Sequence, residues 1–266
     1  MNDESFEEFQ QIVWEQGRLH FRSMPWRDSP TLYYVLVSEL MLQQTQVSRV
    51  LPKFIDFIQQ FPDSESLAEA SLADVLRAWQ GLGYNRRARF LHDAAKQIIQ
   101  TKEPLSFASL QCLPGVGINT AGAIMNYVYE QPTPFVETNI RTVYFHHFFR
   151  GSETVRDKEI YQCVRDTLDY EQPREWFWAL MDYGSYLKSR GLGQLDKSHH
   201  YKKQAPLKGS VREIRGKIIT CLQQGPQKRY QLEQAMVVDE RLDVALEGLQ
   251  RDGLISVTNG QYHLTK

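Results

Sequence analysis

Apolar residues recur every three to four positions along most of the chain, which is the spacing of an amphipathic helix. Between residues 5 and 21 this stripe comprises Phe6, Phe9, Ile12, Val13 and Trp14. The same periodicity predicts further helices at 31–46, 48–60, 65–69, 71–79, 86–101, 106–111, 118–130, 137–149, 156–168 and 173–189. The expected fold class is therefore mainly α.

The C-terminal part follows a different pattern. Three predicted helices at 211–224, 229–236 and 239–252 precede two alternating segments at 254–258 and 261–265. Asn259-Gly260 separates these segments, and an Asn-Gly pair between two strands is a strong hairpin signal. A boundary is expected at the turn-forming segment 205–209. We therefore predict one domain over residues 1–208 and a winged-helix domain over residues 209–266.

Composition narrows the class of protein. The 266 residues allow one or two domains, and hydrophobic and charged contents of 42% and 24% are typical of globular proteins. No apolar run reaches membrane-spanning length, and the acidic, polar N-terminus is unlike a signal or transit peptide. Three cysteines without a CxxC pair argue for a reducing compartment and against a cysteine metal site. We expect a cytoplasmic protein.

The formal net charge of −1 gives no general indication of nucleic-acid binding, so local patches decide that question. One patch holds three arginines within 86–89, and another is 188–208, which includes Lys188 and Arg190. Such runs are often solvated surface, but both lie beside the motifs described next. The third C-terminal helix is instead acidic and is expected to repel phosphates. This predicts that the winged helix docks a protein partner or positions the domain.

The segment Leu113-Pro114-Gly115-Val116-Gly117 separates two predicted helices. Two glycines two residues apart allow a tight turn and leave no Cβ between the backbone and another molecule. The following helix begins with its amide donors facing outward, which favours a phosphate. The segment is a candidate DNA-backbone site, although the same pattern also occurs at packing corners.

Three further segments accompany this turn: Ser38 to Val47 (SELMLQQTQV), Leu82 to Arg89 (LGYNRRAR) and Phe135 to Arg141 (FVETNIR). Together they resemble the helix-hairpin-helix DNA glycosylase superfamily. Within it the adenine DNA glycosylase (MutY-type) branch is the most similar, over about Met24 to Gly184.

The resemblance implies a two-lobed fold, with a six-helix lobe at about 26–133 and a second lobe formed by 1–25 and 134–208. It implies an enzyme of base excision repair that hydrolyses the glycosidic bond of a flipped purine, adenine above all. The implied partner is double-stranded DNA carrying a lesion or a mispair. We expect a monomer associated with the nucleoid.

The resemblance assigns the chemistry to four residues. Breaking an N-glycosidic bond needs an acid that activates the leaving base and a carboxylate that stabilises the cation-like sugar. Glu39 takes the acid role, and its apolar surroundings predict a raised pKa. Glu137 takes the second role where the family has Asp, at a predicted helix start that favours the charged form. Asn139 orients the water or the carboxylate, and Asn119 borders the sugar.

The family pattern also implies a base pocket and a set of DNA contacts. The base pocket comprises Trp26, Arg27 and Asp182. Tyr84 falls where the family inserts an aromatic wedge beside the lesion, which offsets the energy of base extrusion. The carbonyls of Leu113 and Val116 are implied to hold a monovalent cation. The residues expected to bind DNA are Gln43, Gln44, Tyr84, Arg86, Leu113, Gly115, Val116, Gly117, Lys188 and Arg190.

The sequence departs from the family in several places. Asn119 stands where lyase-type glycosylases have a Schiff-base lysine, which favours a monofunctional hydrolase. The spacing of the family's iron–sulfur cluster falls on four residues that are not iron ligands: Lys188, Leu195, Ser198 and Gln204. No cofactor, no 4Fe-4S cluster and no metal at His199-His200 are therefore expected. The sequence contains no match to the family's Nudix-like domain, which leaves the opposing base open.

Two alternatives remain at this stage. A non-catalytic binder of damaged DNA would equally explain Glu137 and the missing cluster, although it has no use for Glu39. A glycosylase for a different modified base is the second, because the extra methylene of Glu137 shifts the carboxylate by roughly 1 Å, enough to change the rate. A retracted backbone, a changed geometry of base or sugar, and a degenerate site are all compatible with this substitution.

Overall fold

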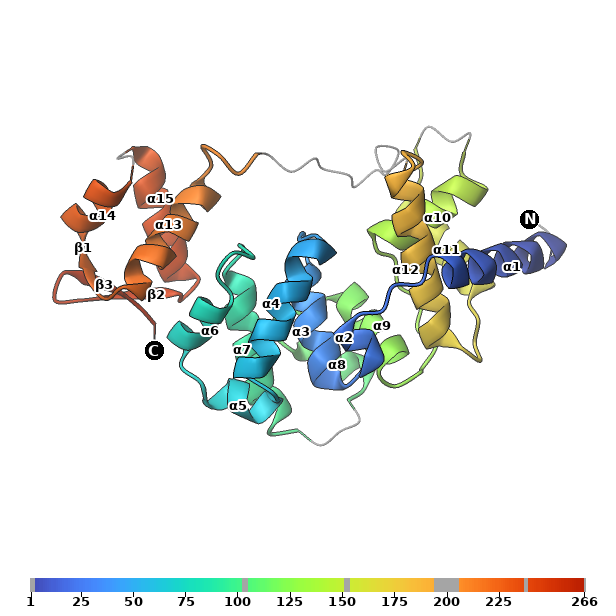
Figure 1. Ribbon diagram of the computed structural model, residues 1–266, viewed down its shortest axis with the longest axis horizontal. Coiled ribbons are helices and arrows are strands. Elements are labelled where there is room, and N and C mark those ends of the chain that lie inside the picture. Colours follow the sequence, from blue (N-terminus) through green and yellow to red (C-terminus); the bar gives the residue numbers. More distant parts are fainter. Residues whose placement is uncertain (1–2, 102–104, 151–153, 194–205, 237–238, 266) are drawn as a thin grey trace. The chain divides into compact units, whose positions relative to one another are not determined.

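The computed structural model describes residues 3–101, 105–150, 154–193, 206–236 and 239–265 (Figure 1). Helices make up most of it, and none in the described part is long and apolar enough to cross a membrane. Chain contacts divide the molecule into two units, which are described separately.

Unit 1 comprises Met1–Val35, Pro104–Cys112 and Val116–Lys203. Its helices are α1 (Asp3–Leu19), α2 (Pro25–Asp28), α8 (Phe107–Cys112), α9 (Ile118–Tyr127), α10 (Thr138–Phe148), α11 (Asp157–Thr167) and α12 (Pro173–Ser189). The central helix is α12, because α1, α9 and α10 all pack against it. Its fully buried Trp176 and Phe177 lie against Phe9 of α1 and Phe135 before α10, with ring centroids 6.2 and 4.4 Å apart.

Small residues let the helices of unit 1 approach closely. A Cβ at Gly17 of α1 would lie 2.3 Å from Ala179 Cβ of α12, and one at Gly122 of α9 would lie 2.8 Å from Phe135 Cβ. Real Cβ atoms do not approach so closely, so these glycines are required by packing. The same holds for Gly184 at the candidate site.

Unit 2 comprises Leu36–Glu103, Leu113–Gly115 and Gln204–Lys266. Its first part holds most of α3 (Leu32–Leu42), then α4 (Val47–Gln60), α5 (Ser64–Glu69), α6 (Leu72–Ala78) and α7 (Arg86–Ile98). Side chains cap the starts of α5 and α6: Asp63 accepts from the Ser66 amide at 2.8 Å and Ser71 from the Asp74 amide at 3.1 Å. The helix α7 packs against α5 and α6.

The C-terminal segment of unit 2 holds α13 (Val211–Gln223), β1 (Gln227–Lys228), α14 (Arg229–Ala235), α15 (Glu240–Arg251), β2 (Ile255–Thr258) and β3 (Gln261–Leu264). The strands form an antiparallel sheet in the order β1-β3-β2, with Ile255 opposite Leu264. Asn259 and Gly260 have φ of 51° and 75°, as a tight hairpin with this pair requires. The predicted hairpin is confirmed.

The helices predicted from periodicity agree with the structure to within a few residues at each end. Two short elements were not predicted: α2 has four residues and β1 has two, too few to show a period. The predicted domain limits at 1–208 and 209–266 stay a prediction, since the contacts group the C-terminal segment with 36–103 in unit 2.

Candidate active site and DNA-binding loops

Glu137 is the residue at which α10 begins. Its backbone is extended, with φ of −104° and ψ of 175°, and its carbonyl accepts the first helical bond from the Arg141 amide at 2.8 Å. The carboxylate makes no capping hydrogen bond to the helix amides. Burial raises the pKa of this carboxyl above its ordinary value of 4.5. This differs from the expected preference for the charged form, because without a cap the desolvation by surrounding protein outweighs the helix dipole.

Two asparagines hold the backbone on either side of Glu137. The Asn119 amide nitrogen donates to the Val136 carbonyl at 3.0 Å, and the Val136 amide donates back to Asn119 Oδ1 at 3.4 Å. The Asn139 amide nitrogen donates to the Met181 carbonyl of α12 at 3.2 Å. Both side chains therefore support the segment that carries the carboxylate, a role that the family pattern did not imply for them.

Lys188 contacts the oxygen end of the Asn139 side chain. Its Nζ donates to Asn139 Oδ1 at 3.2 Å, so both ends of that carboxamide contact protein. Burial, and then the neighbouring Arg22, lower the pKa of the Lys188 amine. Met181 and Lys188 thus fix the orientation of this side chain. The predicted role of Asn139 in orienting the water or the carboxylate stays a prediction. Lys188 and Arg190 lie at the exposed end of α12.

Gly184 brings α12 against the start of α10. A Cβ there would lie 2.2 Å from the Asn139 carbonyl oxygen and 2.6 Å from its carbonyl carbon. Backbone atoms cannot rotate away as a side chain does, so only glycine permits this approach. The position of Glu137 thus depends on a glycine that is distant in sequence.

Asp182 and Arg27 meet in a buried ion pair. Arg27 donates to both oxygens of the carboxylate, at 2.7 and 3.2 Å, and Arg22 donates through Nε at 2.7 Å and through its backbone amide at 3.2 Å. The Asp182 side chain is 0% exposed. Its acceptor positions are therefore filled by the two arginines. The carboxylate therefore joins α12 to α2 and to the segment before α2. The predicted contact of Asp182 with a bound base stays a prediction.

The rest of the expected base pocket is also enclosed. The Arg27 guanidinium lies 5.4 Å from the Trp178 ring and 5.8 Å from the Phe21 ring, and its side chain is 5% exposed. Trp26 is buried in α2. A cationic group between aromatic faces is stabilised by their quadrupoles. Direct contact of Trp26 or Arg27 with a base stays a prediction.

Glu39 lies in unit 2, in the middle of α3. It is half-buried between the buried Leu36 and Leu40, and its carbonyl accepts from the Gln43 amide at 3.2 Å. Its predicted raised pKa stays a prediction. After the helix, Gln44 has a φ of 56° and is exposed, so the chain turns sharply there.

Gln43 connects the end of α3 to the hairpin turn. Its amide nitrogen donates to the Gly115 carbonyl at 3.3 Å. Gly115 has a φ of 79°, and a Cβ there would lie 2.9 Å from Phe90 Cβ and 3.0 Å from a Leu40 methyl. Both the backbone conformation and the packing require glycine at this position.

Gly117 differs from Gly115. It precedes α9 with a φ of −88°, which any residue adopts, and a Cβ there would meet nothing within 4 Å. No side chain caps α9, so its first amides keep their donors for another molecule. The Leu113 and Val116 side chains are buried, which leaves only their backbone for the predicted DNA and cation contacts. Those contacts stay predictions.

Arg87 was grouped with the exposed basic patch, and the structure corrects this. It is 6% exposed and donates to the carbonyls of Leu40, Met41 and Gln43 at 2.6–2.9 Å. It also donates to the Leu82 and Gly83 carbonyls at 3.3 and 3.2 Å. Burial lowers the pKa of its guanidinium to about 10. Arg87 therefore joins the end of α3 to the loop that carries Tyr84. Its place on the apolar stripe of α7, four residues before Leu91, was the available signal.

Arg86 is largely exposed, and Tyr84 is partly exposed. The Arg86 side chain is 59% exposed and its guanidinium lies 3.7 Å from Asp252. Tyr84 is 37% exposed and has a φ of 49°, in a loop where Gly81 and Gly83 also have positive φ. A residue other than glycine rarely adopts a positive φ, and it does so only where the surrounding structure holds it. The backbone of this loop therefore fixes the position of Tyr84.

Possible metal and cofactor sites can be assessed only among the residues that the structure describes. In that part of the chain, no three His, Cys, Asp or Glu side chains lie close enough to hold a metal ion. Leu195, Ser198, Gln204 and the His199-His200 pair lie outside the described residues. Of the predicted cluster positions only Lys188 is described, and its amine contacts Asn139.

The hairpin turn and the acidic residue at the start of α10 define a base-excision DNA glycosylase fold. A family model described as HhH-GPD superfamily base excision DNA repair protein matches residues 37–164. A solved thermostable thymine-DNA glycosylase matches with a TM-score of 0.63 and 22% identity, over 69% of this chain and 87% of that one. A trapped endonuclease III–DNA intermediate matches with a TM-score of 0.58 and 16% identity, over 77% of this chain and 91% of that one. These likenesses show the fold.

Sequence relatives identify the branch. The adenine DNA glycosylase of Mycobacterium tuberculosis is 34% identical over 286 residues, covering 95% of this chain and 91% of the relative. That of Mycolicibacterium smegmatis is 33% identical over 267 residues, covering 91% of each. The human enzyme is 35% identical over 179 residues, covering 62% of this chain and 33% of its own length. The chain belongs to the adenine DNA glycosylase family, and it is a DNA-binding N-glycosylase of base excision repair.

Proposed function

We propose that the protein is a monofunctional adenine DNA glycosylase that removes a flipped adenine from a mispair or from opposite a damaged base. The substrate named for the relatives supports adenine. The observation that carries the proposal is Glu137, a carboxylate at a helix start that does not cap its own helix. A carboxylate used for structure would be expected to accept those amides.

The two glutamates take different roles in this proposal. Glu39 protonates the leaving adenine, and Glu137 stabilises the positive charge that develops on the sugar. Burial makes the Glu137 charge costly in the free protein, and that charge is stabilised once a cation forms beside it. The interaction is thus stronger in the transition state than in the ground state, as catalysis requires. Asn119 and Asn139 keep the carboxylate in place through the backbone.

The residue at position 119 favours a hydrolase over a lyase. The Asn119 side chain makes two hydrogen bonds to the Val136 backbone and has no amine that could form a Schiff base. One other amine to consider is that of Lys188, whose Nζ contacts Asn139. A borohydride trapping reaction with the abasic product therefore belongs in the test.

We propose that the protein works without an iron–sulfur cluster. A lysine at the first cluster position supplies no thiolate, and its amine already takes part in a hydrogen bond to Asn139. Leu195, Ser198 and Gln204 supply none either. Iron analysis of the purified protein tests this proposal.

The test of function is a single-turnover excision assay on duplexes that carry adenine opposite guanine, 8-oxoguanine, cytosine or thymine. We expect adenine release from at least one mispair, and no covalent trapping by borohydride. Glu137→Gln should abolish release while DNA binding persists. The exposed Glu171→Gln, a carboxylate of the same unit, is the matched control and should keep full activity. Full activity of Glu137→Gln would overturn the assignment, and a trapped covalent product would overturn the monofunctional proposal.

A further inference from the structure

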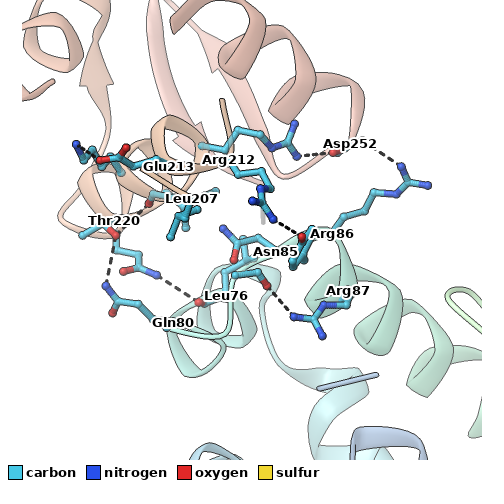
Figure 2. Close-up of a pocket in the computed structure, with 18 of the residues that line it drawn as sticks. Leu76, Gln80, Asn85, Arg86, Arg87, Leu207, Arg212, Glu213, Thr220 and Asp252 are labelled. Atoms are coloured by element: carbon cyan, nitrogen blue, oxygen red, sulfur yellow. Dashed lines mark hydrogen bonds and ion pairs between the residues drawn. The ribbon is translucent and has the colours of Figure 1, made fainter. Parts of the chain in front are cut away.

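A cavity of about 900 Å³ lies within unit 2, between α13 and the loop that leads into α7 (Figure 2). The loop contributes Tyr84 and Asn85, the start of α7 contributes Arg86, and α13 contributes Arg212 and Arg215. Gln43 and Gln44, at the end of α3, also line it. The cavity thus combines an aromatic ring, amide side chains and guanidinium groups, which together are the side chains that contact nucleic acid.

Tyr84 lies between two arginines in this cavity. The Arg87 guanidinium is 5.4 Å from its ring and the Arg212 guanidinium is 5.3 Å from it, and Arg212 also donates to the Tyr84 hydroxyl. Arg87 is held by backbone carbonyls on both sides. Arg212 instead extends from α13 into the cavity, as Figure 2 shows. The C-terminal segment therefore contacts the residue expected to enter the duplex.

The cavity is positively charged, although the C-terminal segment 211–266 as a whole is nearly neutral, with eight Lys or Arg and seven Asp or Glu residues. Five cationic side chains line it against two carboxylates, Glu213 and Asp252. Lys217 pairs with Glu213 at 2.8 Å, and Asp252 pairs with Arg215 and, at 3.7 Å, with Arg86. The acidic side chains of the first turns of α15 are not among the lining residues. The sequence prediction rested on the acidic residues of α15. Those in its first turns do not line the cavity, so they do not determine the charge around Tyr84.

We propose that α13 is part of the DNA-binding surface and that Arg212 contacts a duplex phosphate beside Tyr84. Each strand of a duplex carries one phosphate per roughly 3.4 Å of axis. A guanidinium held against a ring that enters the base stack is therefore brought close to a phosphate. The partner is DNA because the chain is a DNA glycosylase. The inference rests on DNA binding and on the wedge role proposed for Tyr84, and it does not depend on which base is excised.

The test uses the full chain and a duplex with a tetrahydrofuran abasic analogue, which no glycosylase can cut. Binding is measured by fluorescence anisotropy at several salt concentrations. Losing one phosphate contact lowers the salt slope of log K by about 0.9, so Arg212→Ala should bind about fivefold more weakly near 0.15 M salt and about fifteenfold near 0.05 M. Arg212→Lys should keep most of the slope, because it keeps the charge. Arg229→Ala removes one charge from α14 outside the cavity and should change neither quantity.

Three results would overturn the proposal. Unchanged affinity of Arg212→Ala would show that α13 does not touch the duplex. Tighter binding would show that Arg212 blocks Tyr84 instead of assisting it. The third concerns Tyr84→Phe, which removes the hydroxyl that Arg212 contacts and keeps the ring. The loss of slope should persist in that background; if it disappears, Arg212 acts only by holding Tyr84. None of these results depends on excision. A failure of this proposal can therefore be distinguished from a failure of the proposed glycosylase function.

Discussion

Gly184→Ala should impair excision by moving the start of α10. The new Cβ would lie 2.2, 2.6 and 2.9 Å from three backbone atoms of Asn139. Ordinary contacts between such atoms begin near about 3.4 Å, so α12 and the start of α10 must separate by about 1 Å. A misplacement of that size costs about 10²-fold in rate. Overpacking at such a junction also costs about 1–3 kcal/mol of unfolding free energy.

The measurement pairs single-turnover excision with urea unfolding. Gly17→Ala is the matched control, because its Cβ would lie 2.3 Å from Ala179 and so presses on another face of the same helix. Both variants should lose stability to a similar extent. Excision, measured where both are folded, should fall strongly only for Gly184→Ala. The two readouts separate a misplaced carboxylate from a general loss of folded protein.

Two results would refute this reasoning. Full activity of Gly184→Ala would show that the backbone absorbs the Cβ without moving Glu137. An equal loss of rate in Gly17→Ala would show that α12 transmits any strain, and that contact with Asn139 has no special part.

Two further predictions concern stability. Asp182→Asn leaves Arg22 and Arg27 without a charge partner and should lower the unfolding free energy by about 3–5 kcal/mol. Asp28→Asn, an exposed carboxylate on α2, should change it by less than about 0.5 kcal/mol in the same urea titration, as surface changes do; similar values for both would refute the ion pair's importance. For Glu137, the folded pKa is raised, so its favourable contribution is present below the ordinary value of 4.5 and is lost as pH rises through the folded pKa. Glu137→Gln should therefore become the more stable protein as pH rises, and a difference that does not vary with pH would contradict this.

The fold was largely predictable because most helices are long enough to show a period. The place of Glu137 was predictable too, since Pro134 and the helix after it mark a helix start. What the sequence did not reveal is which partner each polar side chain takes. Asp182 and Arg27 are separated by 155 residues. The family resemblance placed both in one base pocket, but it did not indicate that they pair with each other. The charge pattern of α15 likewise gave no indication that Arg212 of α13 lies against Tyr84.

The geometry around Glu137 also limits how the protein accommodates Glu where the family has Asp. A retracted backbone would offset the longer side chain, but the backbone here is held on both sides. Asn119 fixes Val136, while Met181 and Gly184 fix Asn139. We therefore expect the Glu137 side-chain torsions to accommodate the extra methylene. Because the carboxylate makes no cap hydrogen bond, its torsions are not committed to the helix amides. We therefore expect a site of this kind to accommodate glutamate by a change of rotamer, without a shift of the backbone.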